Sequence, residues 1–261
     1  MKQDLRVTLV QADQVWENKQ ANFSNYERLL ANESNTDLIL LPEMFNTGFS
    51  MNASVLAEKM EDSISISWLK GLAKTKNAAV YTSLIIEEEG QFFNRGLFVE
   101  PSGEFHIYDK RKTFGLAGED KVFASGKNVK RVQFRGWNIQ LQICYDLRFG
   151  EIAFNEMNTE TGEANYDLLL YVANWPERRI QHWKNILPAR SIENQCYVAA
   201  VNRVGKDHSE LDYSGDSAIL DLHGNRLVEI VDEEKIETIT LSYTELEEWR
   251  GKLPFLKDRA L

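Results

Sequence analysis

Apolar residues along the chain gather in short runs that alternate with segments of helical periodicity. The runs of strand length are residues 5–10, 38–41, 78–86, 92–99, 105–108, 132–134, 139–144, 168–172 and 197–201. Residues 21–30, 64–73 and 179–195 instead space their apolar positions three or four apart, which brings them to one face of a helix. The two periodicities together predict a mixed α/β fold.

The order of these elements predicts two similar halves. The chain starts strand, helix, strand, helix and then passes through adjacent strands, whereas residues 132–201 repeat a strand-helix-strand-helix-strand order. Two sheets packed together with helices outside accommodate both halves. No Ser/Pro-rich linker separates the halves, so we expect a single domain over residues 1–261.

Composition and charge exclude several classes of protein. Hydrophobic residues make up 43% of the chain and aromatic residues 11%, which is enough for a core and excludes disordered and fibrous proteins. The net charge is -10 and the basic residues are scattered, so we expect no nucleic acid partner. No stretch has the length of apolar sequence that a membrane span needs. We therefore expect no membrane contact and a cytoplasmic location, in which Cys144 and Cys196 stay reduced.

Cys144 closes the alternating run 137–143 and is followed by a polar turn that contains glycine. A side chain at the end of a strand lies at the rim of the sheet, where open α/β sheets build their ligand sites. Cys144 is therefore a candidate nucleophile. The alternative is a small buried hydrophobic residue, which is the commoner role of a free cysteine. Cys196 lies in an apolar context and fits this structural role.

Two charged residues follow other predicted strands. Glu43 comes directly after the apolar run 38–41 and Pro42, where it fits a general base, although a solvated glutamate in a loop is the alternative. Lys110 lies in a cationic cluster and shares a strand face with Tyr108, whereas most such clusters are solvated surface. A lysine near a thiol favours the thiolate and can stabilise an oxyanion.

The histidines give little support to a Cys-His pair. None of His106, His182, His208 and His223 follows an apolar run at a strand end. A set of Glu43, Lys110 and Cys144 would do the same chemistry, with the carboxylate as proton acceptor and the thiol as nucleophile. No Cys-x-x-Cys pair is present, and we expect no metal or cofactor.

These segments resemble the nitrilase, or carbon-nitrogen hydrolase, superfamily, in which Glu, Lys and Cys occur in this order. The motifs are Leu41-Pro42-Glu43-Met44-Phe45, Tyr108-Asp109-Lys110-Arg111 and Ile143-Cys144-Tyr145-Asp146-Leu147-Arg148-Phe149. The second glutamate of the family matches Glu119, which precedes Gly126. The segments 173–176, 183–198 and 213–217 resemble the amidase branch, and within it the chain resembles the YafV-like omega-amidases.

The resemblance implies a four-layer α-β-β-α sandwich, a homodimer, and hydrolysis of small 2-oxo acid monoamides such as 2-oxoglutaramate and 2-oxosuccinamate. It implies an oxyanion site at Lys110 and the backbone amide of Tyr145, beside a turn that leads into a helix. Arg148 would bind the distal carboxylate of the substrate, or else form an ion pair with Asp146 or a neighbouring acidic residue. Trp175 and Phe45 are candidates for the pocket wall, and Arg179 is a second candidate for the carboxylate.

Two other functions remain open on the sequence. The same triad could act on another amide, a carbamoyl amine or a nitrile, and the fold could also serve as an inactive binding protein. The chain departs from the superfamily pattern at Lys112-Thr113, where His-Leu is usual, and at Gly150, where Pro is usual. The first departure concerns the wall beside Lys110.

Overall fold

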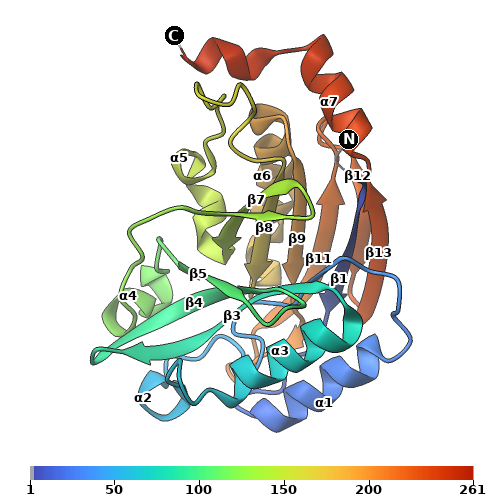
Figure 1. The fold of residues 1–261 in the computed structure, drawn as a ribbon. Coiled ribbons are helices and arrows are strands. Elements are labelled where there is room, and N and C mark those ends of the chain that lie inside the picture. Colours follow the sequence, from blue (N-terminus) through green and yellow to red (C-terminus); the bar gives the residue numbers. More distant parts are fainter. Residues whose placement is uncertain (1–2, 261) are drawn as a thin grey trace.

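Two β-sheets form the centre of the molecule in the computed structural model, which describes residues 3–260. The first sheet has the strand order β13-β1-β2-β3-β4-β5 and the second the order β10-β11-β9-β8-β7-β6, with β12 paired to β11 (Figure 1). The strands of the first sheet are β1 (Leu5–Gln11), β2 (Leu38–Leu40), β3 (Ala79–Glu88), β4 (Gln91–Val99), β5 (Phe105–Asp109) and β13 (Lys235–Leu241). Those of the second are β6 (Lys130–Phe134), β7 (Trp137–Ile143), β8 (Leu168–Ala173), β9 (Tyr197–Asn202), β10 (Val204–Lys206), β11 (Asp212–Leu220) and β12 (Arg226–Val231).

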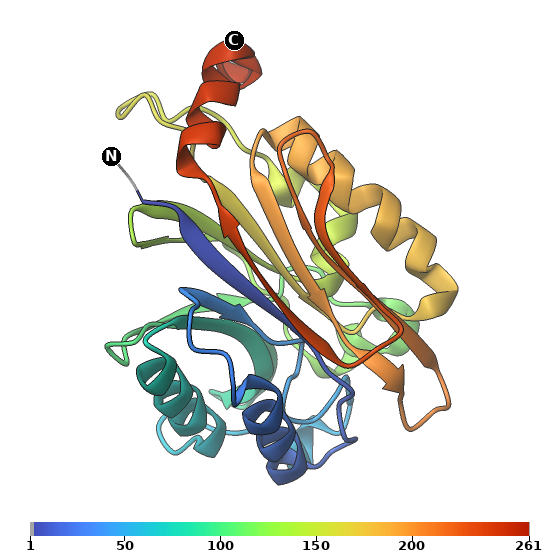
Figure 2. The ribbon, with the colours of Figure 1, turned by 90° about the vertical axis from the view of Figure 1, so that its right-hand side faces the viewer.

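Helices cover the outer face of each sheet (Figure 2). Helices α1 (Lys19–Leu30) and α3 (Ile64–Lys76) contact the first sheet, and α6 (Ile180–Asn194) contacts β9 and β11 of the second. The side chains of Asn18 and Ser63 accept from the first turns of α1 and α3, where a helix leaves backbone N–H groups unpaired. The remaining helices are α2 (Ala53–Leu56), α4 (Glu119–Val122), α5 (Gly150–Ala153) and α7 (Tyr243–Lys252).

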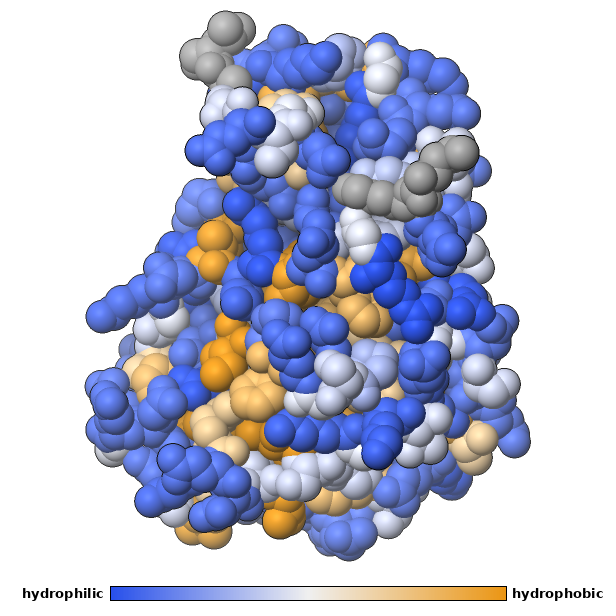
Figure 3. All heavy atoms as spheres, in the orientation of Figure 1, coloured by the Kyte–Doolittle hydropathy of each residue, from blue (hydrophilic) through white to orange (hydrophobic). Residues whose placement is uncertain are grey.

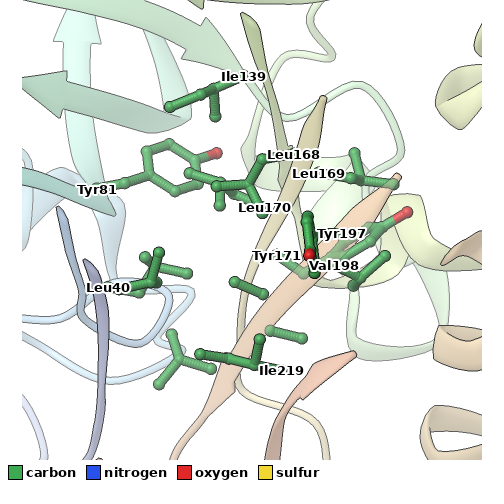
Figure 4. Packing of buried hydrophobic residues seen from close by; sticks show 14 of the residues in the cluster. Leu40, Tyr81, Ile139, Leu168, Leu169, Leu170, Tyr171, Tyr197, Val198 and Ile219 are labelled. Carbon is green, nitrogen blue, oxygen red and sulfur yellow. The ribbon is translucent and has the colours of Figure 1, made fainter. Parts of the chain in front are cut away.

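The two sheets pack against each other through one shared cluster of apolar side chains. Leu40 and Tyr81 of the first sheet belong to the same buried cluster as Ile139, Leu170 and Ile219 of the second (Figure 4). Burial of this apolar surface holds the sheets together. On the face drawn in Figure 3, which is largely hydrophilic, apolar residues gather in the hollow between the two halves.

The expected four-layer α-β-β-α sandwich is therefore confirmed, but the C-terminal part was not predicted. Strands β10 to β13 and helix α7 have no counterpart among the predicted elements. Strand β13 pairs antiparallel with β1, so the end of the chain returns to the sheet in which the chain began. These strands escaped prediction because β12 and β13 are amphipathic, with charged residues between the apolar ones, and β10 has three residues. No helix in the described range 3–260 is long and apolar enough to cross a membrane.

The chemistry-bearing residues of the sequence follow the ends of strands. Glu43 comes three residues after β2, Lys110 directly follows β5, and Cys144 directly follows β7. Strand β2 is parallel to β1 and β3, and β7 is parallel to β8, so the carboxyl ends of several strands meet at one edge. This edge carries the candidate site.

Candidate active site

A buried ion-pair cluster joins one lysine to two glutamates. Lys110 Nζ lies 2.8 Å from Glu43 Oε1 and 2.9 Å from both carboxylate oxygens of Glu119. The side chains of all three are at most 1% exposed. Gly126 donates its N–H to the Lys110 carbonyl, and a Cβ at this glycine would lie 2.0 Å from the backbone oxygen of Asp109. A glycine is therefore required where this segment passes the lysine.

Glu43 is oriented by donors from two other strands. The backbone N–H of Asn174, which directly follows β8, donates to Glu43 Oε2 at 2.9 Å. The side chain of Asn94, in β4, donates to Glu43 Oε1 at 2.8 Å and to Glu119 Oε1 at 3.1 Å. Gln14 donates to the backbone oxygen of Glu43 at 3.0 Å. The carboxylate is consequently fixed in one orientation next to the cysteine.

Cys144 begins the tight turn η2 (Cys144–Arg148) and has a backbone φ of 44°, in the left-handed region that non-glycine residues rarely adopt. Asp146 fixes this turn by accepting from Ile143 N–H at 3.1 Å, Lys112 N–H at 2.9 Å and the Tyr108 hydroxyl at 2.7 Å. The turn leads into the four-residue helix α5 rather than into a long helix. Hydrogen bonds to Asp146, more than a helix dipole, therefore hold the thiol in place.

The charges around the thiol keep it protonated at rest. Burial and the neighbouring Glu43 carboxylate raise the pKa of Cys144 well above its ordinary value, and the positive charge of Lys110 offsets only part of this. The pKa of Lys110 is raised despite burial, because Glu119 and Glu43 stabilise the ammonium. Lys110 favours the thiolate, as expected, but burial and Glu43 outweigh it, so the resting site holds a thiol beside a carboxylate that can accept its proton.

A cavity of about 420 Å³ opens over Cys144. Its wall includes Cys144, Lys110 and Asn174 together with aromatic and cationic side chains, among them Phe49, Phe114, Tyr145, Arg148, Trp175, Arg178, Arg179 and Tyr213. Ammonium, thiol and arginines thus face one space, which has the size of a small-molecule site.

Arg148 lies on the cavity wall without a carboxylate partner among residues 3–260. Its guanidinium carbon stacks 4.6 Å from the centre of the Trp175 ring, and its Nη1 lies 3.1 Å from His182 Nδ1. Asp146 is fully buried and occupied by Ile143, Lys112 and Tyr108, so the alternative pairing of Arg148 with Asp146 is not found.

Two further predicted wall residues also line the cavity. Trp175 is held by Asn202, which accepts from its backbone N–H at 2.7 Å, and Arg179 stacks 4.9 Å above the Phe114 ring. Burial lowers the pKa of Arg179, and the neighbouring positive charges of Arg178 and Arg148 lower it further.

Phe45 does not line the cavity. The expectation that it forms part of the pocket wall is wrong, because the ring is fully buried in a second core cluster. It packs 5.9 Å from the Phe23 ring and 5.6 Å from the Trp68 ring, both on helices that cover the first sheet. The left-handed turn at Met44, with φ of 44°, separates Phe45 from Glu43.

Sequence reasoning missed two contributors to the site, Asn94 and Asp146. Both are polar residues next to apolar positions, and both are at most 1% exposed. A buried polar side chain needs hydrogen-bond partners, so an asparagine inside the run 92–99 was a usable signal. Its partners lie far away in the sequence, however, and only the fold identifies them.

A Glu-Lys-Cys cluster on a cavity between two sheets of this kind defines a carbon-nitrogen hydrolase. The model of the family Carbon-nitrogen hydrolase matches residues 6–250, and the chain belongs to this family. The protein is therefore a hydrolytic enzyme.

Particular relatives narrow this class. Omega-amidase YafV of Escherichia coli (strain K12) is 39% identical over 256 residues, which are 97% of this chain and 96% of the relative. The 2-oxoglutaramate amidase of Bacillus subtilis (strain 168) is 31% identical, with coverage of 97% and 96%. The crystal structure of XC1258 from Xanthomonas campestris, a CN-hydrolase superfamily protein with an arsenic adduct in its active site, has a TM-score of 0.95 and 41% identity, with coverage of 97% and 96%.

Proposed function

We propose that the protein hydrolyses the terminal amide of small 2-oxo dicarboxylic acid monoamides, such as 2-oxoglutaramate and 2-oxosuccinamate, to the acid and ammonia. The observation that carries this proposal is that Arg148 faces the same cavity as Cys144 and has no carboxylate partner within residues 3–260. A guanidinium beside a nucleophile and without a carboxylate partner in residues 3–260 suits a substrate with an amide at one end and a carboxylate at the other. The similarity to enzymes named omega-amidase and 2-oxoglutaramate amidase supports this substrate class.

The first half of the reaction forms a thioester on Cys144. Glu43 accepts the thiol proton as the sulfur attacks the amide carbon, and the carbonyl oxygen becomes an oxyanion. Lys110 has three N–H donors, and if one serves Glu43 and one is shared by the two Glu119 oxygens, the third is available for the oxyanion. The backbone N–H of Tyr145 is the second proposed donor. Glu43 then passes its proton to the nitrogen, and ammonia leaves.

The second half releases the acid. Glu43 takes a proton from a water molecule, and the resulting hydroxide attacks the thioester carbon. The sulfur leaves and regains the proton from Glu43, which restores the resting thiol. Glu119 keeps the ammonium of Lys110 in place through both halves.

Substrate binding uses the cationic side of the cavity. Arg148 provides two parallel donors for the distal carboxylate, and Trp175 supports the guanidinium from behind. Arg179, on the same wall, is the second candidate for binding the carboxylate. The arginines line the cavity, whereas Glu43 lies behind its wall. The neutral amide end of the substrate therefore faces Cys144, and its anionic end faces the arginines.

A panel of substrates tests this proposal. Ammonia release is measured with 2-oxoglutaramate, 2-oxosuccinamate, propionamide and a small aliphatic nitrile, for the natural enzyme and for Arg148→Met. We expect kcat/KM to favour the 2-oxo amides, and Arg148→Met to lower it by about 10-fold to 100-fold for these substrates, as for loss of a hydrogen bond to a charged group. Its effect on propionamide should stay below about threefold. Equal losses on both amides, or preference for the nitrile, would contradict the proposal, and no turnover of any substrate would support an inactive binding protein.

We also propose a homodimer in the cytoplasm. The dimer is what the resemblance to the carbon-nitrogen hydrolase family implies. Both cysteines are free thiols, which fits a reducing compartment. Light scattering coupled to size-exclusion chromatography would give about twice the mass of one chain for the dimer, and the mass of one chain would contradict it.

A further inference from the structure

Asn94 occupies the centre of the buried charge cluster. It lies in β4 and is 1% exposed. Its side-chain nitrogen donates to Glu43 Oε1 at 2.8 Å and to Glu119 Oε1 at 3.1 Å. Its backbone oxygen accepts from the N–H of Lys110 at 3.0 Å. One residue thus contacts all three ionised members of the cluster.

The cluster needs a neutral donor at this position. With the thiol protonated, two carboxylates face one ammonium, so the buried group carries a net negative charge. Repulsion between Glu43 and Glu119 favours rotation of either carboxylate away from the other. The two amide hydrogens of Asn94 bind one oxygen of each and oppose this rotation. A flexible lysine chain alone does not fix both carboxylates, whereas Asn94 is anchored in a paired strand.

We propose that Asn94 is a positioning residue for the proton transfer at Cys144. By binding Glu43 Oε1, together with Lys110, it leaves Glu43 Oε2 for the N–H of Asn174, whose backbone oxygen lies 3.9 Å from Cys144 Sγ. Asn94 itself does not touch the reacting atoms. The inference rests on the proposed roles of Glu43 and Cys144, but it does not depend on which amide is the substrate.

The test uses two variants that keep the shape of the side chain. Asn94→Leu removes both donors, and Asn94→Asp removes them and adds a negative charge. Asn155→Leu is the matched control, because Asn155 is equally buried and its side-chain nitrogen also donates twice, to the backbone oxygens of Tyr166 and Asn194, away from the site. Each variant is measured for kcat and KM on the amide that the natural enzyme hydrolyses best, and for the pH dependence of Cys144 alkylation by iodoacetamide.

We expect Asn94→Leu to lower kcat by about 10-fold to 100-fold, the cost of removing hydrogen bonds to a charged group, with little change in KM. The acid limb, which is the pH range over which alkylation of Cys144 rises from its low value in acid, should move to higher pH in Asn94→Leu, because the ionised carboxylates lose a donor. It should move further in Asn94→Asp, because this variant also adds a like charge. Asn155→Leu should lower thermal stability without moving either kcat or the acid limb.

Two outcomes would overturn the inference. One is that Asn94→Leu and Asn94→Asp fold and keep both the kcat and the pH dependence of Cys144 alkylation of the natural enzyme. The other is a loss of activity that only follows the unfolded fraction, as in Asn155→Leu. Should Asn94→Leu not fold, Asn94→Asp and Asn94→Ser, which keeps one hydroxyl donor, are scored in the same way. Because alkylation needs no substrate, the inference can fail or hold independently of the proposed amide.

Discussion

The two cysteines of the chain are both buried, yet they differ in their backbone conformation, their charged neighbours and their access to the cavity. Cys144 is 8% exposed, follows the end of β7 in a left-handed backbone conformation, and faces the cavity next to Glu43 and Lys110. Cys196 is fully buried in the core between α6 and β9. Burial raises the pKa of Cys196 to about 12.

The comparison shows that a shifted pKa does not by itself mark a reactive thiol. Both thiols are neutral at rest, because burial disfavours the thiolate in both places. Charged groups, among them Arg250 and Asp167, also lie near Cys196. Cys144 differs because it lines the cavity beside Lys110 and lies next to Glu43, the proposed proton acceptor. In the proposed mechanism, reactivity at Cys144 therefore comes from proton transfer during attack and not from a pre-formed thiolate.

The largest expected effect separates the two thiols directly. Cys144→Ser should lower kcat for amide hydrolysis by at least about 10⁴-fold, since loss of a nucleophile removes the covalent pathway. Cys196→Ser should change kcat by less than about threefold, although the buried hydroxyl should lower the melting temperature. Steady-state ammonia release and thermal unfolding measure both effects. Comparable turnover by the two variants would remove the basis of the comparison.

The next effect tests the proton acceptor. Glu43→Gln keeps the shape of the side chain and removes its basicity, so kcat should fall by about 10²-fold to 10⁴-fold. Glu58→Gln is the control, because Glu58 is a largely buried glutamate whose partners are Lys19, Ser63 and Ser65. It should alter stability and leave kcat nearly unchanged. A Glu43→Gln enzyme with natural kcat would mean that another group takes the proton.

The smallest effect concerns the turn that distinguishes Cys144. Burial raises the pKa of Asp146 to about 6, whereas a free aspartate titrates near 3.8. Because the folded protein binds this proton more tightly than the unfolded chain, Asp146 stabilises the fold fully below about pH 4, and this stabilisation is lost as the pH rises through about 6. The whole contribution is worth about 3 kcal/mol. Urea unfolding of the natural protein relative to Asp146→Asn should therefore show a larger advantage at pH 4.5 than at pH 7. An advantage independent of pH would show that Asp146 does not titrate in this range.

Much of the fold followed from periodicity. The buried strands such as β7 and β8 were predictable from their apolar runs, and the helices α1 and α3 from apolar positions that repeat with a clear period. Helix α6 was also predicted, but its apolar face was not, because Ile192 is exposed and Arg190 and Ser191 are buried. Strand β13 was not, since its pairing with β1 joins residues more than 220 positions apart. Such pairing depends on the whole fold and not on local pattern.

For the site, the residues at strand ends were predictable and their partners were not. Glu43, Lys110 and Cys144 each follow an apolar run, and the phase of β5 correctly predicted that Lys110 shares the buried face of Tyr108. Asn94 and Asp146 act through contacts with distant segments, which no local pattern reveals. Phe45 was misplaced because the left-handed turn at Met44 redirects the chain into the core.

The central claim is that Cys144 is the nucleophile, and the most direct measurement follows its chemical modification together with activity. The enzyme is treated with iodoacetamide at neutral pH, with and without 2-oxosuccinamate, and peptide mass spectrometry quantifies alkylation of each cysteine while ammonia release gives the remaining activity. We expect activity to fall in proportion to alkylation of Cys144, substrate to slow both, and Cys196 to stay unmodified until the protein is unfolded. Activity that persists after complete alkylation of Cys144, or that falls in step with Cys196, would contradict the account.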